Sequence, residues 1–224
     1  HTLRVPGRRV TWLGNGIDLS RFDGAHTHRA AVRSEWGLGD DDVVVGVVGR
    51  LVREKGFAEI VAAARLLREG GTPATIIVVG PSDPDKRDGL DDDALRDATS
   101  LGIRFVGRRD DMPDCYAAMD VFLTATHREG FPRAAMEASA SGLPLVATDI
   151  RGCRQVVQHG VTGLLVPVRD APAIASAVAK LVADPGLRWR FGTAATAKAA
   201  SDFDQQRVIE LTLATYEQQL ARCR

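Results

Sequence analysis

The chain has 224 residues, 45% of them hydrophobic and 26% charged, which is ordinary for a globular protein that buries one sizeable core. Its 29 basic and 29 acidic residues cancel to a net charge of +0, so the sequence lacks the broad basic field that a nucleic-acid partner requires. Cys115, Cys153 and Cys223 show no zinc-ligand spacing, and no segment is patterned as a signal peptide or a bilayer span. We therefore expect a cytoplasmic protein with reduced thiols.

Short apolar runs alternate along the chain with stretches of helical periodicity, a pattern typical of a parallel sheet with crossover helices. A strand at 9–13 and a turn at 14–16 come first, and a polar connector is expected over 24–42. Strands are then predicted at 43–48, 74–79, 103–106, 121–124, 145–148 and 163–166, and helices at 57–69, 112–119, 132–141, 171–183 and 205–223. Because the six later strands are almost entirely apolar, helices should cover both faces of the sheet. The predicted fold is a doubly wound α/β sheet of the Rossmann-like kind.

The loop at 49–56, GRLVREKG, follows a buried strand and leads into a helix. It begins at Gly49 and presents Arg50 and Lys55 beside a helix N-terminus, where backbone amides and the helix dipole favour an anion. Such a cationic pair can neutralise a diphosphate. The loop is neither a Walker A motif nor a dinucleotide fingerprint, because the spacing of glycines that each motif requires is absent. The alternative interpretation is a pair of solvated cations at a helix start.

The loop at 127–137, HREGFPRAAME, carries two carboxylates, with Glu129 before a helix and Glu137 inside it. The stretch from Pro132 to Glu137 spans about 7 to 8 Å of helix axis, so the two carboxylates can reach opposite ends of one elongated ligand. Free backbone amides are expected at the helix start, on Gly130, Phe131 and Arg133. Glu137 faces apolar neighbours and should need hydrogen-bond donors such as ligand hydroxyls, whereas Glu129 taken alone is an ordinary loop acid.

The loop at 106–112, VGRRDDM, lies between a predicted strand and a predicted helix. Gly107 permits close approach of the backbone next to Arg108. Asp110 or Asp111 is expected to cap the helix that follows. All three loops follow parallel strands, and open α/β sheets bind ligands at the carboxyl ends of their strands.

Together these loops resemble the C-terminal, donor-binding domain of GT-B retaining glycosyltransferases of the group 1, family 4 type, which carry a Glu-x7-Glu motif. The landmarks, in order, are GNGIDLSRF at 14–22, GRLVREKGF at 49–57, FVGRRDDMPDCYAAMDVFL at 105–123, and the run from 128 through EGFPRAAME to ATDIRGCRQVVQHGVTGLLVP, which ends at 167. The resemblance covers nearly the whole chain.

The resemblance implies roles at the phosphate and sugar end of a nucleoside-diphosphate sugar. Arg50 and Lys55 would hold the diphosphate and stabilise the leaving nucleotide. Glu129, with the amides of Gly130 and Phe131, would bind hydroxyls of the donor sugar. The acceptor would attack from the face that the nucleotide leaves, with a phosphate oxygen taking its proton, so that neither glutamate need be a nucleophile.

The resemblance also implies roles at the nucleoside end. Glu137 would accept hydrogen bonds from the ribose hydroxyls, and the backbone around Gly107 and Arg108 would border the base. Further donor-binding positions are Gly49, Pro132 and Arg133. The family uses no divalent metal, so we expect neither a metal nor any other cofactor.

A second half of the enzyme is implied as well. Residues 1–23 would be the last strand and linker of a missing N-terminal acceptor domain, 24–203 the donor-binding domain, and 204–224 a C-terminal helix packing on the missing domain. The isolated fragment should lack turnover, because no closed cleft orients the acceptor. The missing domain would allow peripheral association with the inner face of the membrane.

A shorter segment bears on the identity of the donor nucleotide, and two alternative functions remain open. GPSDPD at 80–85 replaces the Gly-x-Gly turn of many relatives, and with TDIRGCRQVV it resembles enzymes of capsule and lipopolysaccharide assembly, which favours a UDP-sugar. A sugar-nucleotide epimerase of the same architecture would need no acceptor. A nucleotide-binding module without turnover is the non-enzyme alternative.

Overall fold

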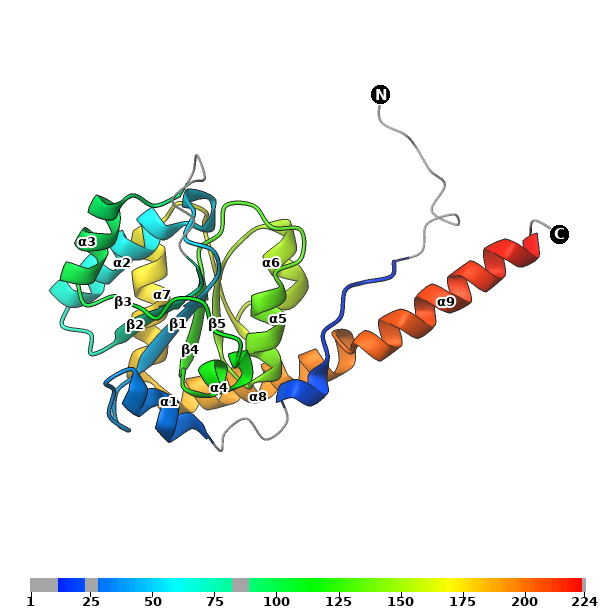
Figure 1. Ribbon diagram of the computed structural model, residues 1–224, viewed down its shortest axis with the longest axis horizontal. Helices are drawn as coiled ribbons and strands as arrows, with labels where there is room; N and C mark the ends of the chain where they lie inside the picture. Colours follow the sequence, from blue (N-terminus) through cyan, green and yellow to red (C-terminus); the bar gives the residue numbers. More distant parts are fainter. Residues whose placement is uncertain (1–11, 23–27, 82–88, 223–224) are drawn as a thin grey trace, which may run out of the picture.

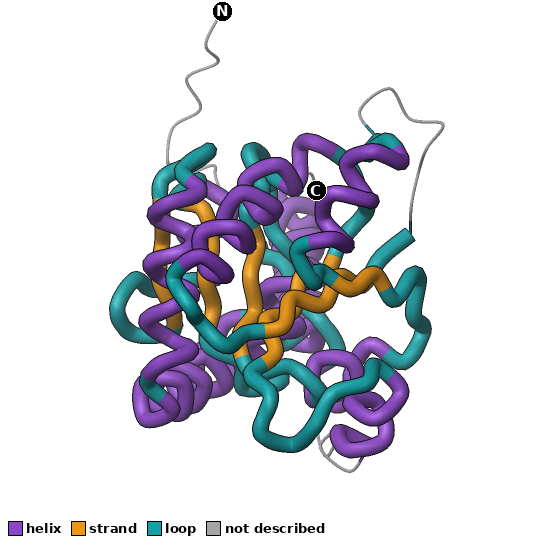
Figure 2. The backbone as a smooth tube through the Cα atoms, turned by 90° about the vertical axis from the view of Figure 1, so that its left-hand side faces the viewer, coloured by secondary structure: helices purple, strands orange, loops and turns teal. Residues whose placement is uncertain are grey.

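The computed structural model describes residues 12–22, 28–81 and 89–222. Its centre is a six-stranded, all-parallel sheet in the order β3-β2-β1-β4-β5-β6. The strands are β1 Val44–Val48, β2 Thr75–Val79, β3 Arg104–Phe105, β4 Val121–Thr124, β5 Leu145–Thr148 and β6 Gly163–Val166. Figure 2 shows the strands lying between layers of helices. The predicted doubly wound, Rossmann-like fold is confirmed.

The winding of the chain reverses between β1 and β4. β1 pairs with β2 on one side, from Val44↔Thr75 to Val48↔Val79, and with β4 on the other side. The chain therefore moves outward through β2 and β3 before it returns to place β4 beside β1. A reversal of this kind opens a crevice at the carboxyl ends of the two central strands, where open α/β sheets bind ligands.

The helices cover both faces of the sheet (Figure 1). They are α1 Arg29–Glu35, α2 Phe57–Glu69, α3 Asp92–Ser100, α4 Met112–Ala117, α5 Arg133–Ala140, α6 Arg151–Val156, α7 Ala171–Ala183, α8 Pro185–Asp202 and α9 Gln205–Arg222, with short 3-10 helices η2 Leu19–Phe22 and η4 Arg53–Lys55. One core joins a face of the sheet to α2, α3 and α7, and the other core joins the opposite face to α1, α4, α5 and α6. α8 contributes to both cores. No described helix is both long enough and apolar enough to cross a bilayer.

Most predicted elements are present, and four helices were missed. The strands at 121–124, 145–148 and 163–166 and the helices at 57–69 and 171–183 have the predicted bounds, and the others differ by one or two residues at an end. The missed helices are α1, α3, α6 and α8. The strand predicted at 9–13 falls mostly outside the described residues, and Trp12 and Leu13 are irregular.

The prediction of a polar connector over 24–42 is wrong, because α1 lies inside it. The side chain of Arg33 in this helix is 1% exposed. It donates to the carbonyl oxygens of Gly39 and Ala118 and pairs with Asp120 at 3.3 Å. The charge is thus buried with partners, one of which is 87 residues away in the sequence. Local periodicity gives no sign of such a helix.

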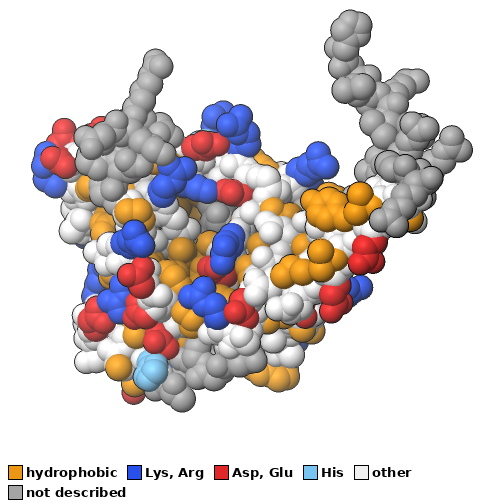
Figure 3. Space-filling model, turned by 45° about the vertical axis from the view of Figure 1, so that its right-hand side comes forward, with side chains coloured by type: hydrophobic (Ala, Val, Ile, Leu, Met, Phe, Trp, Pro, Cys, Tyr) orange, Lys and Arg blue, Asp and Glu red, His pale blue; other side chains and the backbone are white. Residues whose placement is uncertain are grey.

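The last helix, α9, projects away from the sheet (Figure 1). Its large apolar side chains are exposed: Ile209 by 48%, Leu211 by 41%, Leu213 by 55%, Tyr216 by 63% and Leu220 by 66%. Figure 3 shows hydrophobic side chains gathered on this flank of the molecule. α9 is thus an amphipathic helix with exposed apolar side chains, although the segment before it is anchored by a bridge between Ile17 and Asp204.

Candidate functional site

The loops after β1 and β4 meet at the reversal point of the sheet. Gly56 has a φ of +76°, and a Cβ added to it would lie 2.1 Å from the carbonyl oxygen of Ala125, so only glycine allows this contact. The preceding residue, Lys55, donates a hydrogen bond to Glu129 and forms an ion pair with it. Their side chains are 29% and 25% exposed. The structure thus brings together two residues that the sequence assigned to one site.

Further contacts tie the same two loops together. The amide of His127 donates to the carbonyl oxygen of Glu54 at 2.9 Å, and the carboxylate of Glu54 accepts from Arg128 at 3.3 Å. The ring of His127 lies 3.1 Å from a carboxylate oxygen of Glu59. Sequence reasoning gave Glu54, Glu59 and His127 no role, because their partners are 68 to 74 residues away and no local motif marks them.

The start of α6 packs against the backbone of Glu129. A Cβ added to Gly152 would lie 2.2 Å from the carbonyl oxygen of Glu129 and 3.0 Å from that of Gly130. Thr148, at the end of β5, donates to the carbonyl oxygen of Thr126 at 2.6 Å. The loop that carries Glu129 is therefore held between α6 and the first turn of α2.

Glu137 occupies the inner side of α5 with a side chain that is 13% exposed. It accepts hydrogen bonds from the Tyr116 hydroxyl and from Arg133, both at 3.0 Å. Burial raises the pKa of the Tyr116 hydroxyl well above its ordinary value, and the charge of Glu137 adds to the shift, so Tyr116 keeps its proton and donates. The sequence predicted ligand hydroxyls as donors, whereas the protein already supplies two.

Gly49, Arg50 and Arg108 line one small cavity of about 250 Å³, together with Val48, Val79, Gly80, Pro81, Arg109 and Met112. The carbonyl oxygen of Gly107 accepts from the amide of Gly80 at 2.8 Å, but a Cβ added to Gly107 would meet no described atom within 4 Å, so no contact within the described chain uses the close approach expected there. A Cβ on Gly80 would lie 1.9 Å from the Gly49 carbonyl oxygen. The loop assigned to the diphosphate and the loop assigned to the base thus share one cavity.

The capping role expected of Asp110 or Asp111 is wrong. Asp111 stands at the N-cap position of α4, but its side chain makes no capping hydrogen bond. It accepts two hydrogen bonds from Arg109 instead, at 2.8 and 2.6 Å, and this guanidinium lowers the pKa of the Asp111 carboxyl. Asp110 pairs with Arg108 at the surface.

The start of α5 presents the expected backbone amides. Pro132 is the N-cap residue and Arg133 is the first helical residue, so the helix starts one position later than predicted. Within the described part of the chain, the amides of Gly130, Phe131 and Arg133 donate no hydrogen bond. The ring of Phe131 packs edge-on against Phe203, with centroids 6.1 Å apart. These amides are therefore available to a ligand.

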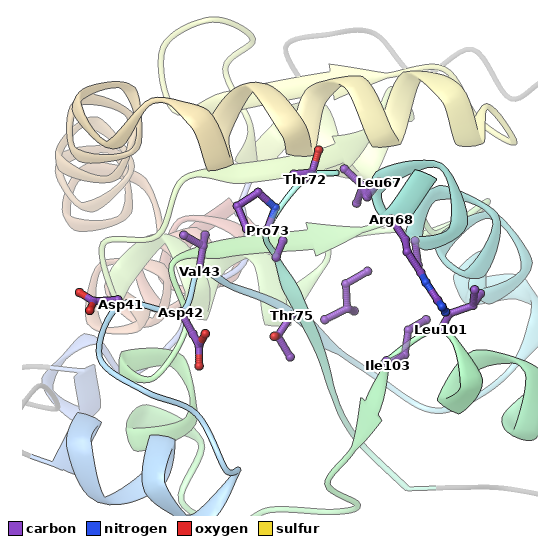
Figure 4. A pocket seen from close by; sticks show the side chains of 14 residues that line it. Asp41, Asp42, Val43, Leu67, Arg68, Thr72, Pro73, Thr75, Leu101 and Ile103 are labelled. Atoms are coloured by element: carbon purple, nitrogen blue, oxygen red, sulfur yellow. The ribbon is translucent and has the colours of Figure 1, made fainter. Parts of the chain in front are cut away.

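A larger cavity lies at the opposite, amino edge of β1 and β2. Its volume is about 420 Å³, and Val43, Thr75 and Ile103 line it together with Arg68, which extends from α2 toward Leu101 (Figure 4). Arg68 donates to the carbonyl oxygen of Ser100 at 3.1 Å. No residue of the three predicted loops lines this cavity, so the carboxyl edge remains the candidate site.

The candidate site carries charges of both signs, without a broad field of one sign. Figure 3 shows Lys and Arg interspersed with Asp and Glu, and most cations of the site are paired with a carboxylate. Across residues 12–22, 28–81 and 89–222, no three His, Cys, Asp or Glu side chains cluster in a way that would ligate a metal ion.

Comparison with known proteins places this site in context. Residues 28–198 match the sequence model of a family described as glycosyl transferases group 1. The chain is 30% identical over 207 residues to the capsular polysaccharide biosynthesis glycosyltransferase CapM of Staphylococcus aureus, covering 90% of this chain and 53% of that protein. Sucrose-phosphate synthase from Thermosynechococcus elongatus has a TM-score of 0.80 at 29% identity, over 93% of this chain and 52% of that one. HepE of Anabaena, solved with UDP-glucose, has a TM-score of 0.78 at 25% identity, over 92% and 56%. The chain spans about half the length of each.

Proposed function

Because the chain belongs to the group 1 glycosyl transferases, we propose that it is the donor-binding half of a retaining glycosyltransferase that uses a nucleoside-diphosphate sugar. The observation that carries this proposal is the meeting of Lys55 and Glu129 at the reversal point of the sheet. The UDP-glucose bound by HepE favours a UDP-sugar, and the name of CapM favours glycan assembly such as capsule or lipopolysaccharide. We assign Glu129 and Glu137 to the Glu-x7-Glu motif of family 4 members.

The phosphate end of the donor is assigned to the loop that begins at Gly49. Lys55 and Arg50 supply positive charge there, and negative charge on the leaving phosphate grows as the sugar departs. Fixed cations stabilise that transition state more than the bound donor, so they raise turnover. Two cations and open backbone amides can do the electrostatic work of a metal ion, and we propose that no divalent metal takes part.

The sugar end of the donor is assigned to the start of α5. Glu129 and the amides of Gly130 and Phe131 offer one acceptor group and two donors, which suits sugar hydroxyls. In the retaining reaction the acceptor oxygen approaches the face from which the nucleotide leaves, and a phosphate oxygen takes its proton. Glu129 then orients the sugar through hydrogen bonds and forms no covalent bond to it.

The nucleoside end is assigned to Glu137 and to the cavity beside Gly107. Glu137 is held by Tyr116 and Arg133, so its carboxylate is fixed before ribose arrives. A carboxylate has about four lone-pair positions, which leaves capacity for two ribose hydroxyls. Arg108 borders the cavity proposed for the base.

The acceptor is assigned to a domain in the half of the relatives' length that this chain does not span. In α9 four of the exposed apolar residues, Ile209, Leu213, Tyr216 and Leu220, are spaced four, three and four residues apart, which places them on one face of the helix, whereas the exposed Leu211 lies off that face. We propose that this face packs on the acceptor domain. Residues 1–23 connect to that domain, and 24–203 bind the donor. The 224-residue chain alone should bind without transferring sugar.

Calorimetry of this chain with uridine, UDP, ADP, GDP and UDP-glucose tests the proposal. We expect UDP and UDP-glucose to bind, and UDP to bind more tightly than uridine, because the diphosphate adds contacts with Lys55. Binding of no nucleoside diphosphate would overturn the proposed function. Conversion of UDP-glucose to an epimer without acceptor would show an epimerase instead.

A further inference from the structure

A partly buried histidine–carboxylate contact lies beside the proposed donor site and has been given no role in it above. His127, in the loop after β4, places its Nε2 atom 3.1 Å from an Oε1 atom of Glu59, in the first turn of α2. The side chains are 21% and 14% exposed. A carboxylate in the first turn of a helix is favoured by the helix dipole, but that effect requires neither burial nor a histidine partner.

Glu59 is costly to bury in this environment. Its second oxygen, Oε2, is inaccessible to solvent and accepts no hydrogen bond from any described residue. A buried carboxylate oxygen without a donor lowers stability, because its interaction with water is lost and not replaced. The contact with His127 is therefore poor as a device for stability alone.

The His127–Glu59 contact joins the same two segments of the chain as the Lys55–Glu129 ion pair. Lys55 and Glu59 are four residues apart on one segment, and Glu129 and His127 are two residues apart on the other. The two cross-loop contacts, Lys55 to Glu129 and Glu59 to His127, therefore join the same two segments. Other charged groups next to the histidine are Glu54 and Arg128, which pair with each other.

We propose that His127 and Glu59 form a positioning pair that keeps Lys55 in place when the donor diphosphate draws it away from Glu129; this inference rests on the proposed function. During that exchange the central ion pair opens, and the loops after β1 and β4 lose one of their links. The His127–Glu59 contact and the hydrogen bond from the His127 amide to Glu54 remain. Lys55 then meets the phosphate from a fixed backbone.

The test compares variants that keep the hydrogen bond between His127 and Glu59 with a variant that removes it. Glu59→Leu combined with His127→Leu removes both polar groups and leaves no unpaired charge, so the chain should fold. His127→Gln keeps an N–H donor that can reach Glu59. His28→Leu is the matched control, because His28 also lies 3.1 Å from a carboxylate oxygen, that of Asp114, but its side chain is 65% exposed and belongs to the residue before α1. Thermal melts establish that each variant is folded.

Calorimetry with UDP and with uridine gives the readout. We expect the double variant to bind UDP about tenfold more weakly with uridine affinity unchanged, and His127→Gln and His28→Leu to bind both as the wild type does. Equal losses for UDP and uridine, no loss of UDP affinity, or a His127→Gln variant as weak as the double variant would each overturn the positioning role. A wild-type chain that binds UDP no better than uridine would instead overturn the proposed function, and this inference with it.

Discussion

Lys55 donates a hydrogen bond to Glu129 across the reversal point of the sheet and so joins two loops whose residues are 74 positions apart. The contact has a consequence for binding. Under the proposed function, we expect a diphosphate that pairs with Lys55 to compete with Glu129 for the ammonium donors, which frees the carboxylate to accept hydrogen bonds from the sugar. We therefore expect phosphate binding and sugar binding to be coupled through this ion pair.

The first prediction concerns the cations of the loop at 49–56. Replacing both Arg50 and Lys55 by Ala should remove most of the difference in affinity between UDP and uridine, because that difference comes from the diphosphate. Charged hydrogen bonds of this kind contribute about 1.5 to 3 kcal/mol each. Calorimetry of the double variant with both ligands checks this. A variant that still prefers UDP by the wild-type margin would place the diphosphate elsewhere.

The second prediction separates the two glutamates. Glu137→Ala should weaken UDP and UDP-glucose alike, by about 1 to 3 kcal/mol, because hydrogen bonds to ribose are lost from both. Glu129→Ala should weaken UDP-glucose relative to UDP, because only the sugar contact is lost. Since Lys55 no longer has a competing partner, UDP affinity should be unchanged or slightly higher.

Two further variants serve as controls for this comparison. Glu210→Ala removes an exposed acid from α9 and should leave both affinities unchanged. Glu137→Gln keeps a side chain that can face Tyr116 and Arg133, so it separates the loss of ribose contacts from a collapse of α5. Equal losses of UDP affinity in Glu129→Ala and Glu137→Ala would contradict the two-ended placement.

The sheet could be predicted from the sequence because its strands are buried on both faces. Such strands are continuous apolar runs, and those at 121–124, 145–148 and 163–166 were found at their bounds. α8 was missed because its buried positions include small residues: Leu187, Phe191, Ala195 and Ala199 recur every four residues without forming a strongly apolar stripe. α3 was missed because it begins with Asp91–Asp93, which cap and start the helix.

The candidate site was predictable where one segment carries the whole signal. EGFPRAAME and GRLVREKG each follow a strand, so their residues had to reach one edge of the sheet. The groups that hold them in place were not predictable. Tyr116, Glu59 and Gly152 act through partners 21 to 68 residues away or through a backbone contact, and neither leaves a local pattern.

The third prediction concerns metal ions. UDP binding should persist in EDTA, because we assign the diphosphate to Lys55 and Arg50. Calorimetry in EDTA and in added Mg²⁺ or Mn²⁺ should give the same UDP affinity. Loss of binding in EDTA that either metal restores would show that a metal ion bridges the diphosphate.

The fourth prediction follows from two buried thiols. Burial raises the pKa of Cys115 to about 12 and that of Cys153 to about 11, from an ordinary value of 9.0. The unfolded chain therefore releases these protons at lower pH than the folded chain does. Their contribution to the free energy of unfolding is fully present below pH 9 and is lost as the pH rises toward 11 to 12.

Urea titrations at pH 8 and pH 10 measure this loss. Each thiol contributes a slope of up to about 1.4 kcal/mol per pH unit, so Cys153→Ala should lose about 1 kcal/mol less than the wild type between the two values. Lysines and tyrosines titrate alike in the variant and the wild type, so their effect cancels when the two losses of unfolding free energy are subtracted. Identical losses in the variant and the wild type would mean that Cys153 ionises in the folded chain as it does in the unfolded one.

The last prediction tests whether α6 positions Glu129. Gly152→Ala adds a methyl group 2.2 Å from the carbonyl oxygen of Glu129, so the backbone of that loop must shift. Overpacking of this kind costs about 1 to 3 kcal/mol of stability. The shift should also reduce the preference for UDP-glucose over UDP. Gly39→Ala is the control, because its nearest neighbour would be Asp42 at an ordinary 3.7 Å. A stable Gly152→Ala variant with unchanged preference would show that the loop yields without moving the Glu129 carboxylate, and that α6 plays no part in placing it.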